Sequence, residues 1–189
     1  MALLQAAVDF DAYEIVLRDK PPEMLALSPK GTVPVLALPN GSVIEQSLDI
    51  MRWALEPQDA LGWWASSQTP SNLALLALND GEFKQHLDRY KYPEKFERKP
   101  SGFHRDAATA GLIDPLEQRL ATQLYLGGDK PSAVDLAIFP FIRQFRAVDV
   151  VWFDAQTIPA TQLWLQRWLA SALFAGCMKK LPVNTRAPF

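Results

Sequence analysis

The hydrophobic pattern of this 189-residue chain changes near residue 57, and the change limits the folds that the chain can adopt. Before this point, short apolar runs alternate with turn residues and single turns of helix, as in a small sheet. After it, strand patterns disappear and apolar residues recur three or four positions apart, as on one face of an α-helix. The sequence therefore predicts a mixed α/β domain over residues 1–57 and an all-helical domain over residues 58–189.

Five elements are predicted in the first domain: a helical fragment (1–7), a strand (11–17), a short helix from Pro21, a hairpin around Pro39-Asn40-Gly41 and a helix from Ser47. Tyr13, Ile15 and Leu17 alternate along the strand and therefore share one of its faces. The Asn-Gly pair favours a tight hairpin turn because both residues adopt positive φ readily. Ser47 is expected to be the N-cap of the helix that follows.

Helical patterns dominate the second domain. Residues 56–69 are expected to form a linker, and Ser132 with Asp135 has the spacing of a capping box at a helix start. Three apolar stripes are predicted to face the core: Leu73, Leu76, Asp80, Phe83, Leu87 and Tyr90; Ala108, Leu112, Leu116 and Leu120; and Trp164, Leu165, Trp168 and Leu169.

Composition excludes several functions. The formal net charge is -2, so no excess of positive charge is present to hold a nucleic-acid backbone. One cysteine cannot form an internal disulfide, and together with two histidines it is too few for a Cys/His zinc site. Low cysteine usage is typical of a reducing compartment. No metal and no nucleic-acid partner are expected.

The sequence also favours a soluble, cytoplasmic protein without a membrane partner. Residues 1–8 lack the basic region and the apolar length of a signal peptide. The longest apolar stretch, 133–142, is interrupted by Asp135 and Pro140 and is about half of what a membrane-spanning helix needs.

Two short segments of the first domain are candidates for a site. Thr32-Val33-Pro34 stands at the start of a predicted strand, where an ordinary trans proline is tolerated and only about 5–6% of such bonds are cis. Gln46-Ser47 stands at the start of a helix. A serine there needs no function beyond capping, but the free amides of a helix start also bind carboxylates.

In order and spacing, these segments resemble the N-terminal domain of the glutathione transferases. The resemblance rests on residues 28–36 (Ser-Pro-Lys-Gly-Thr-Val-Pro-Val-Leu) and 43–50 (Val-Ile-Glu-Gln-Ser-Leu-Asp-Ile). It continues over residues 79–93 and 139–145, which look like a bacterial subgroup, and over the box at 132–135. It implies a thioredoxin-like N-terminal domain followed by the helical bundle of this family.

The resemblance also implies a glutathione site. A cis Val33–Pro34 bond would turn the backbone N–H and C=O of Val33 toward the cysteinyl unit of glutathione. Ser47 would bind the γ-glutamyl carboxylate, and Gln46 would add a side-chain contact. Lys30 would face the glycyl carboxylate, although it is equally suited to an exposed, solvated position.

An apolar electrophile would bind against the helical domain. The candidate walls of this hydrophobic pocket are aromatic residues that are equally suited to an ordinary core: Phe83, Tyr90, Phe141, Phe145 and Trp152.

The sequence departs from the family at its beginning. Residues 1–6 resemble the second half of the family's first helix, so the first strand and the catalytic Cys, Ser or Tyr would lie upstream of Met1. No internal residue is an obvious replacement, and Cys177 is expected to be a buried structural thiol. Three outcomes are open: the polypeptide starts earlier, which we favour, the 11–17 strand shifts to pair directly, or another chain fills the gap. If the polypeptide does not start earlier, we expect the 11–17 segment to be displaced, swapped or poorly paired.

Two functions follow from the resemblance. The first is a glutathione transferase that conjugates glutathione to an electrophile or exchanges thiols with a disulfide, with weak activity expected because the thiolate-stabilising residue is missing. The alternative is a non-catalytic module that binds a ligand or a protein. Glutathione is the expected ligand in both cases, and a homodimer is implied because family members usually pair.

Overall fold

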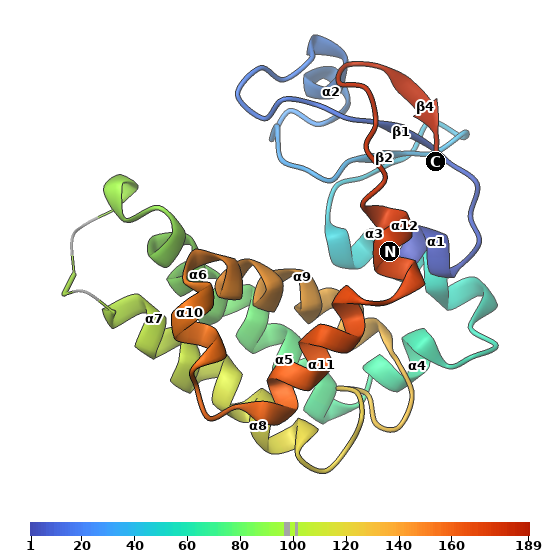
Figure 1. Cartoon of the computed structure of the whole chain (residues 1–189). Helices are drawn as coiled ribbons and strands as arrows, with labels where there is room; N and C mark the ends of the chain where they lie inside the picture. The colour runs from blue at the N-terminus through green and yellow to red at the C-terminus, as the bar shows by residue number, and fades with distance from the viewer. Residues whose placement is uncertain (97–98, 101) are drawn as a thin grey trace. The chain divides into compact units, whose positions relative to one another are not determined.

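The structure is a computed structural model that describes residues 1–96, 99–100 and 102–189 (Figure 1). The chain divides into two compact units. One contains residues 1–59 and 172–189, and the other contains residues 60–171. The first division lies close to the predicted boundary at residue 57. Residues 172–189, which were expected in the helical domain, belong instead to the N-terminal unit.

The N-terminal unit contains short elements from both ends of the sequence. In chain order they are α1 (Ala2–Gln5), β1 (Asp11–Tyr13), α2 (Pro22–Leu27), β2 (Leu36–Ala37), β3 (Val43–Ile44), α3 (Ser47–Leu55), a 3₁₀ turn (Glu56–Gln58), α12 (Ala172–Cys177) and β4 (Arg186–Pro188). Helix α1 packs against both α3 and α12. The buried apolar side chains of this unit are few: Ala2, Ile50, Met51, Ala54 and Leu55.

The strands of this unit form two separate antiparallel pairs. Strand β2 pairs with β3, which is the predicted hairpin, and β1 pairs with β4. The expected strand over residues 11–17 is regular only over 11–13, and both Tyr13 and Leu17 are exposed. Within the described residues no four-stranded sheet is formed. The partner of β1 was not foreseen, because it comes from residues 186–188 of the same chain.

The second unit is helical, as predicted. Its helices are α4 (Trp63–Ser67), α5 (Pro70–Leu78), α6 (Lys84–Lys91), α7 (Phe103–Ala108), α8 (Asp114–Leu120), α9 (Ala133–Val148), α10 (Val150–Asp154) and α11 (Pro159–Leu169), with a 3₁₀ turn at Pro93–Lys95. The expected linker over residues 56–69 is therefore wrong in part, because it contains helix α4. No helix in the described part of the chain is long and apolar enough to cross a membrane.

Two π-helical turns interrupt the long helical stretches of this unit. One joins α5 to α6 at Asn79–Phe83, and the other joins α7 to α8 at Thr109–Ile113. The first predicted stripe is wrong in part: Leu76, Phe83 and Leu87 are buried and Tyr90 is half-buried, whereas Leu73 and Asp80 are exposed. The extra residue of a π turn shifts the helical phase, so a single 3.6-residue stripe cannot describe both sides of the turn.

A buried carboxylate organises the start of helix α9. Asp135 is fully buried and forms the predicted capping box with Ser132. Its carboxylate accepts hydrogen bonds from the Ser132 amide (3.0 Å) and hydroxyl (2.8 Å), the Leu126 amide (2.7 Å) and Trp164 Nε1 (2.8 Å). Burial raises the pKa of Asp135, while all four donors stabilise its ionised form. The residue therefore connects the loop before α9, the start of α9 and helix α11.

A second carboxylate caps helix α11 from a distant helix. The two oxygens of Glu117, on α8, accept hydrogen bonds from the amides of Ala160 (3.1 Å) and Thr161 (2.8 Å). These amides lie in the first turn of α11, where backbone donors have no partner within the helix. The cap fixes α8 against the start of α11.

We predict that Asp135→Ala lowers the free energy of unfolding by about 3 kcal/mol or more, because several buried donors lose their acceptor. Urea denaturation followed by circular dichroism measures the change. Asp129→Ala is the matched control, since Asp129 is an exposed aspartate in the loop before α9. The control should change stability by about 0.5 kcal/mol or less. Equal effects of the two substitutions would contradict the structural role of Asp135.

Candidate functional site

The segment before strand β2 exposes backbone groups that have no partner. The Val33–Pro34 peptide bond is cis, as the family resemblance implies. Thr32, Val33 and Pro34 are exposed, and Val33 retains 48% of its accessible surface. Within the described residues, the N–H and C=O of Val33 form no hydrogen bond. A ligand with a complementary donor and acceptor can therefore bind here without displacing an internal contact.

The start of helix α3 is also unpartnered. Ser47 is the first helical residue and not the N-cap, because Gln46 has extended backbone angles and its C=O accepts from the Ile50 amide (2.9 Å). No side chain caps the helix. Among the described residues, the amides of Ser47, Leu48 and Asp49 find no acceptor, so they are available to a ligand oxygen, and Asp49 is the acidic side chain of the same turn.

The β2–β3 hairpin brings these two segments to one end of the sheet. Leu36 pairs with Ile44, and Pro34 and Gln46 each lie two residues beyond this pair on the same side. A hydrogen bond from Ser28 Oγ to Glu45 Oε1 (2.5 Å) ties the preceding loop to the same place. The predicted glutathione residues Lys30, Val33, Pro34, Gln46 and Ser47 therefore gather at one end of the hairpin.

Glu45 dominates the electrostatics of this region. The hydrogen bond from Ser28, followed by contact with Lys30, lowers the pKa of Glu45. Lys30 Nζ lies 3.3 Å from Glu45 Oε2 and its side chain is 62% exposed. The charges of Lys30 and Glu45 largely offset each other. The amides at the start of α3 are therefore the main group there that attracts an anion.

Two regions of the chain match models of one protein family. Residues 1–56 match the N-terminal domain of glutathione S-transferase, and residues 104–167 match its C-terminal domain. The chain belongs to the glutathione S-transferase family. Many solved structures share its fold.

Three of these solved structures illustrate the similarity. The bacterial transferase BphK, solved as a ternary complex, is 19% identical, with 94% of this chain and 90% of that chain covered and a TM-score of 0.74. URE2P6 from Phanerochaete chrysosporium, solved with oxidized glutathione, is 18% identical, with 93% and 86% covered and a TM-score of 0.77. A sphingomonad glutathione S-transferase complexed with glutathione is 18% identical, with 94% and 89% covered and a TM-score of 0.71. At these identities the comparison shows a transferase fold with a small sheet region and a helical domain.

The predicted pocket residues of this transferase divide into two groups. Phe83 and Phe145 are almost completely buried and belong to the core of the helical unit. Tyr90 and Trp152 are half-buried and pack on Phe145, with ring centroids 5.4 Å and 6.1 Å from it. Phe141 is half-buried beneath the ammonium group of Lys84, at 5.8 Å. Tyr90, Phe141 and Trp152 thus keep surface that can meet a ligand.

Arg105 adds a group that the sequence analysis missed. Its guanidinium lies over the Trp152 ring at 4.4 Å, so a cation stands at the aromatic cluster. Burial raises the pKa of Tyr90 and keeps its hydroxyl protonated as a donor. No spacing in the sequence connects Arg105 with Trp152, because the contact depends on how α7 and α10 pack.

The two histidines of the chain lie in direct contact with each other. Nδ1 of His86, on α6, lies 2.8 Å from Nδ1 of His104, on α7. Such a contact requires one ring to donate and the other to accept, so it favours neutral imidazoles. No group of three or more His, Cys, Asp and Glu side chains in the described part of the chain is placed to hold a metal ion.

Cys177 also differs from its expectation. It ends helix α12 and is half-buried, whereas a fully buried thiol was expected. The small core of the N-terminal unit explains the difference, because α12 packs on the short helix α1 and has no completely buried residue.

We predict that Ser28→Ala raises the pKa of Glu45, because the hydrogen bond from Ser28 is the largest influence that lowers it. Carboxyl carbon shifts in an NMR titration measure this pKa. Lys30→Gln is the comparison, and it should also raise the pKa of Glu45, because Lys30 lowers this pKa by a hydrogen bond and by its charge. An unchanged pKa of Glu45 in Ser28→Ala would contradict the role of the hydroxyl.

We also predict that acidification destabilises the helical unit through His104. Burial, and then the proximity of His86, Arg89 and Lys99, lowers the pKa of His104 below its ordinary 6.5. The unfolded chain therefore binds a proton more readily, so this contribution to stability is complete above pH 6.5 and is lost as the pH falls through the lower folded value.

Thermal unfolding at about pH 7.5 and pH 5.5 tests this expectation. His104→Gln removes the titration, so its Tm should fall less on acidification than that of the wild type. An equal fall in both proteins would contradict the assignment.

Proposed function

We propose that this transferase binds glutathione along residues 30–34 and the first turn of α3. The proposal rests on one observation. Two sets of backbone groups without a hydrogen-bond partner lie at the same end of the hairpin: the Val33 N–H and C=O, and the Ser47–Asp49 amides. Glutathione offers what these groups lack, namely a peptide backbone with its own donor and acceptor and a carboxylate at the γ-glutamyl end. Two similar structures were solved in complex with oxidized glutathione and with glutathione, which supports the same ligand here.

The γ-glutamyl carboxylate would bind at α3. Ser47 Oγ and the amides of residues 47–49 would donate to its oxygens, and the helix dipole would add attraction. The Gln46 side chain is exposed beside this turn and would contact the γ-glutamyl amino group or carboxylate. No internal hydrogen bond has to break for this half of the ligand.

The cysteinyl and glycyl units would extend along the segment before β2. Val33 would pair with the cysteinyl backbone in the manner of an added strand. Lys30 would contact the glycyl carboxylate, in exchange for part of its interaction with Glu45. Because Glu45 already holds Lys30, we expect this contact to contribute less affinity than the Ser47 end.

The proposed reaction is transfer of the glutathionyl group to an electrophile or a disulfide; in the exchange with a disulfide, the thiolate of glutathione bonds to one sulfur, the S–S bond breaks and the other sulfur leaves as a thiolate. In conjugation, the thiolate forms a bond to an electrophilic carbon and the leaving group departs with the bonding electrons; the thiol proton passes to solvent. The exposed edges of Tyr90, Phe141 and Trp152 would supply the apolar surface for the second substrate. A homodimer and a cytoplasmic location stay predictions from the family resemblance and the composition.

We predict that Ser47→Ala weakens glutathione binding about tenfold, because a hydrogen bond to a charged group contributes about 1.5–3 kcal/mol. Isothermal titration calorimetry measures the affinity. Ser42→Ala is the matched control, since Ser42 is an exposed serine of the same hairpin outside the proposed site, and its affinity should equal that of the wild type. Equal binding by wild type and Ser47→Ala would contradict the site.

Turnover of glutathione with a chloronitrobenzene substrate separates the two functional hypotheses. Release of chloride with formation of the thioether supports the transferase. Glutathione binding without turnover supports the non-catalytic ligand-binding module. Absence of glutathione binding in the calorimeter would overturn the transferase and the proposed glutathione site, and would favour the protein-interaction form of the non-catalytic module.

A further inference from the structure

Strand β1 is completed by a segment that lies 175 positions away in the sequence. In the β1–β4 ladder, Asp11 faces Pro188, Ala12 faces Ala187 and Tyr13 faces Arg186. Two further backbone bonds flank the ladder: the Phe189 amide donates to the Phe10 carbonyl (3.0 Å), and the Asn184 amide donates to the Glu14 carbonyl (2.8 Å). Figure 1 shows this red strand beside the blue β1.

Side chains select this segment and its register. Arg186 Nε lies 2.7 Å from Asp11 Oδ2, and the rings of Phe10 and Phe189 stack at 5.1 Å with 19° between their planes. Backbone bonds alone accept any extended peptide, whereas these two contacts require a basic residue three positions before an aromatic one. The edge of β1 is therefore built to accept residues 184–189.

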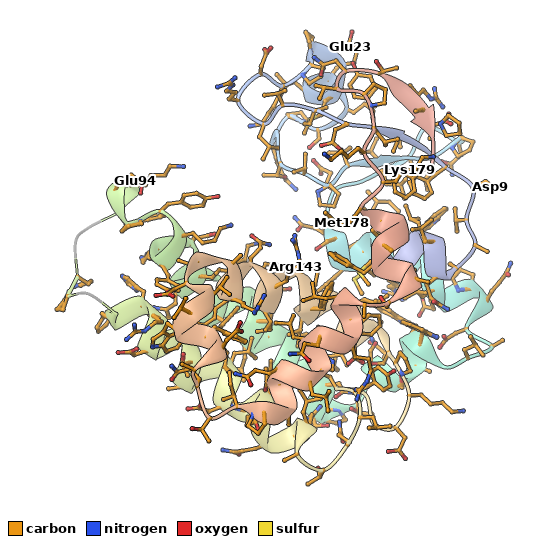
Figure 2. All side chains as sticks on the ribbon, in the orientation of Figure 1. Asp9, Glu23, Glu94, Arg143, Met178 and Lys179 are labelled. Carbon is orange, nitrogen blue, oxygen red and sulfur yellow. The ribbon has the colours of Figure 1, made fainter. Side chains whose placement is uncertain are left out.

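Little else holds this segment in place. Residues 178–185 contain no helix and no regular strand, and Val183 and the Arg186 side chain are mostly exposed. The side chain of Lys179, labelled in Figure 2 just beyond α12, contacts the Pro188 carbonyl and the Phe189 ring of its own segment, and its amide lies 3.4 Å from the Gly176 carbonyl of α12. Exposed backbone bonds and little buried apolar surface are typical of a part of a protein that opens readily.

We propose that the edge of β1 is a docking surface for residues 184–189 of a second copy of this chain, so that two molecules exchange their β4 strands. The exchanged pair makes the same ladder, the same Asp11–Arg186 contact and the same Phe10–Phe189 stack as the closed chain. The residues that recognise the second copy are thus already present in the molecule. The exchange does not involve the groups that are proposed to bind glutathione.

A second copy is favoured over an unrelated peptide for two reasons. It carries the matching Arg186 and Phe189 in the correct register. In the exchange each copy gives its β4 strand to the other and receives the other's β4 strand, so neither β1 edge is left unpaired. In the closed chain the tether gives the segment a high effective concentration, so exchange is expected at high protein concentration.

Charge reversal in full-length chains tests the exchange. D11R places two cations opposite each other, and R186D places two anions, so each variant weakens its own β1–β4 contact. When D11R and R186D are mixed, exchange pairs Arg with Asp at both interfaces. We expect an affinity-tagged D11R chain to capture untagged R186D about tenfold better than it captures untagged D11R.

Controls separate exchange from association through other surfaces. The D11R/R186D double variant restores the pair within one chain, so its self-capture should equal that of the wild type. Hydrogen exchange at the Asn184 and Phe189 amides should be faster in each single variant and should slow again when the two are mixed. Capture that is the same in all mixtures, or amides that stay unprotected in the mixture, would overturn the proposal.

Discussion

Every backbone N–H and C=O needs a hydrogen-bond partner in the protein or access to a ligand or water, and this requirement shapes the N-terminal unit. Its helices and strands are short and its buried apolar side chains are few, so the burial of apolar side chains alone determines little of how its segments are arranged. The requirement is met at β1 by residues 186–188. It is left open at Val33 and at the first turn of α3. The proposed ligand site and the proposed exchange surface are two consequences of the same constraint.

The helical unit obeys a different constraint, because its core is large and its polar anchors are buried. Asp135 and Glu117 each accept from amides at a helix start, one within its own helix and one across to another helix. An aromatic cluster around Phe145 and Phe139 fills the space between the helices. This unit therefore presents Tyr90, Phe141 and Trp152 from a rigid support, which a substrate surface needs.

Local patterns in the sequence predicted what local interactions determine. The β2–β3 hairpin follows from Asn40-Gly41, and the α9 capping box follows from the three-residue spacing of Ser132 and Asp135. The order of the 28–36 and 43–50 segments was sufficient to predict the family and the two-part fold. Three features depend on packing between distant parts of the chain and were missed: the β1–β4 pair, the contact between His86 and His104, and the Glu117 cap on α11. The uncapped start of α3 was missed for another reason, since Ser47 has the side chain of a cap but stands one position too late.

The return of residues 172–189 to the N-terminal unit has a consequence for biosynthesis. Residues 60–171 form a compact unit whose contacts lie within one continuous stretch, so this stretch can fold while the ribosome is still adding residues. Strand β1 precedes its partner by more than 170 residues, so the partner is translated after the whole of residues 60–171. Strand β1 therefore has an unpaired edge while the residues between the two strands are being added to the nascent chain.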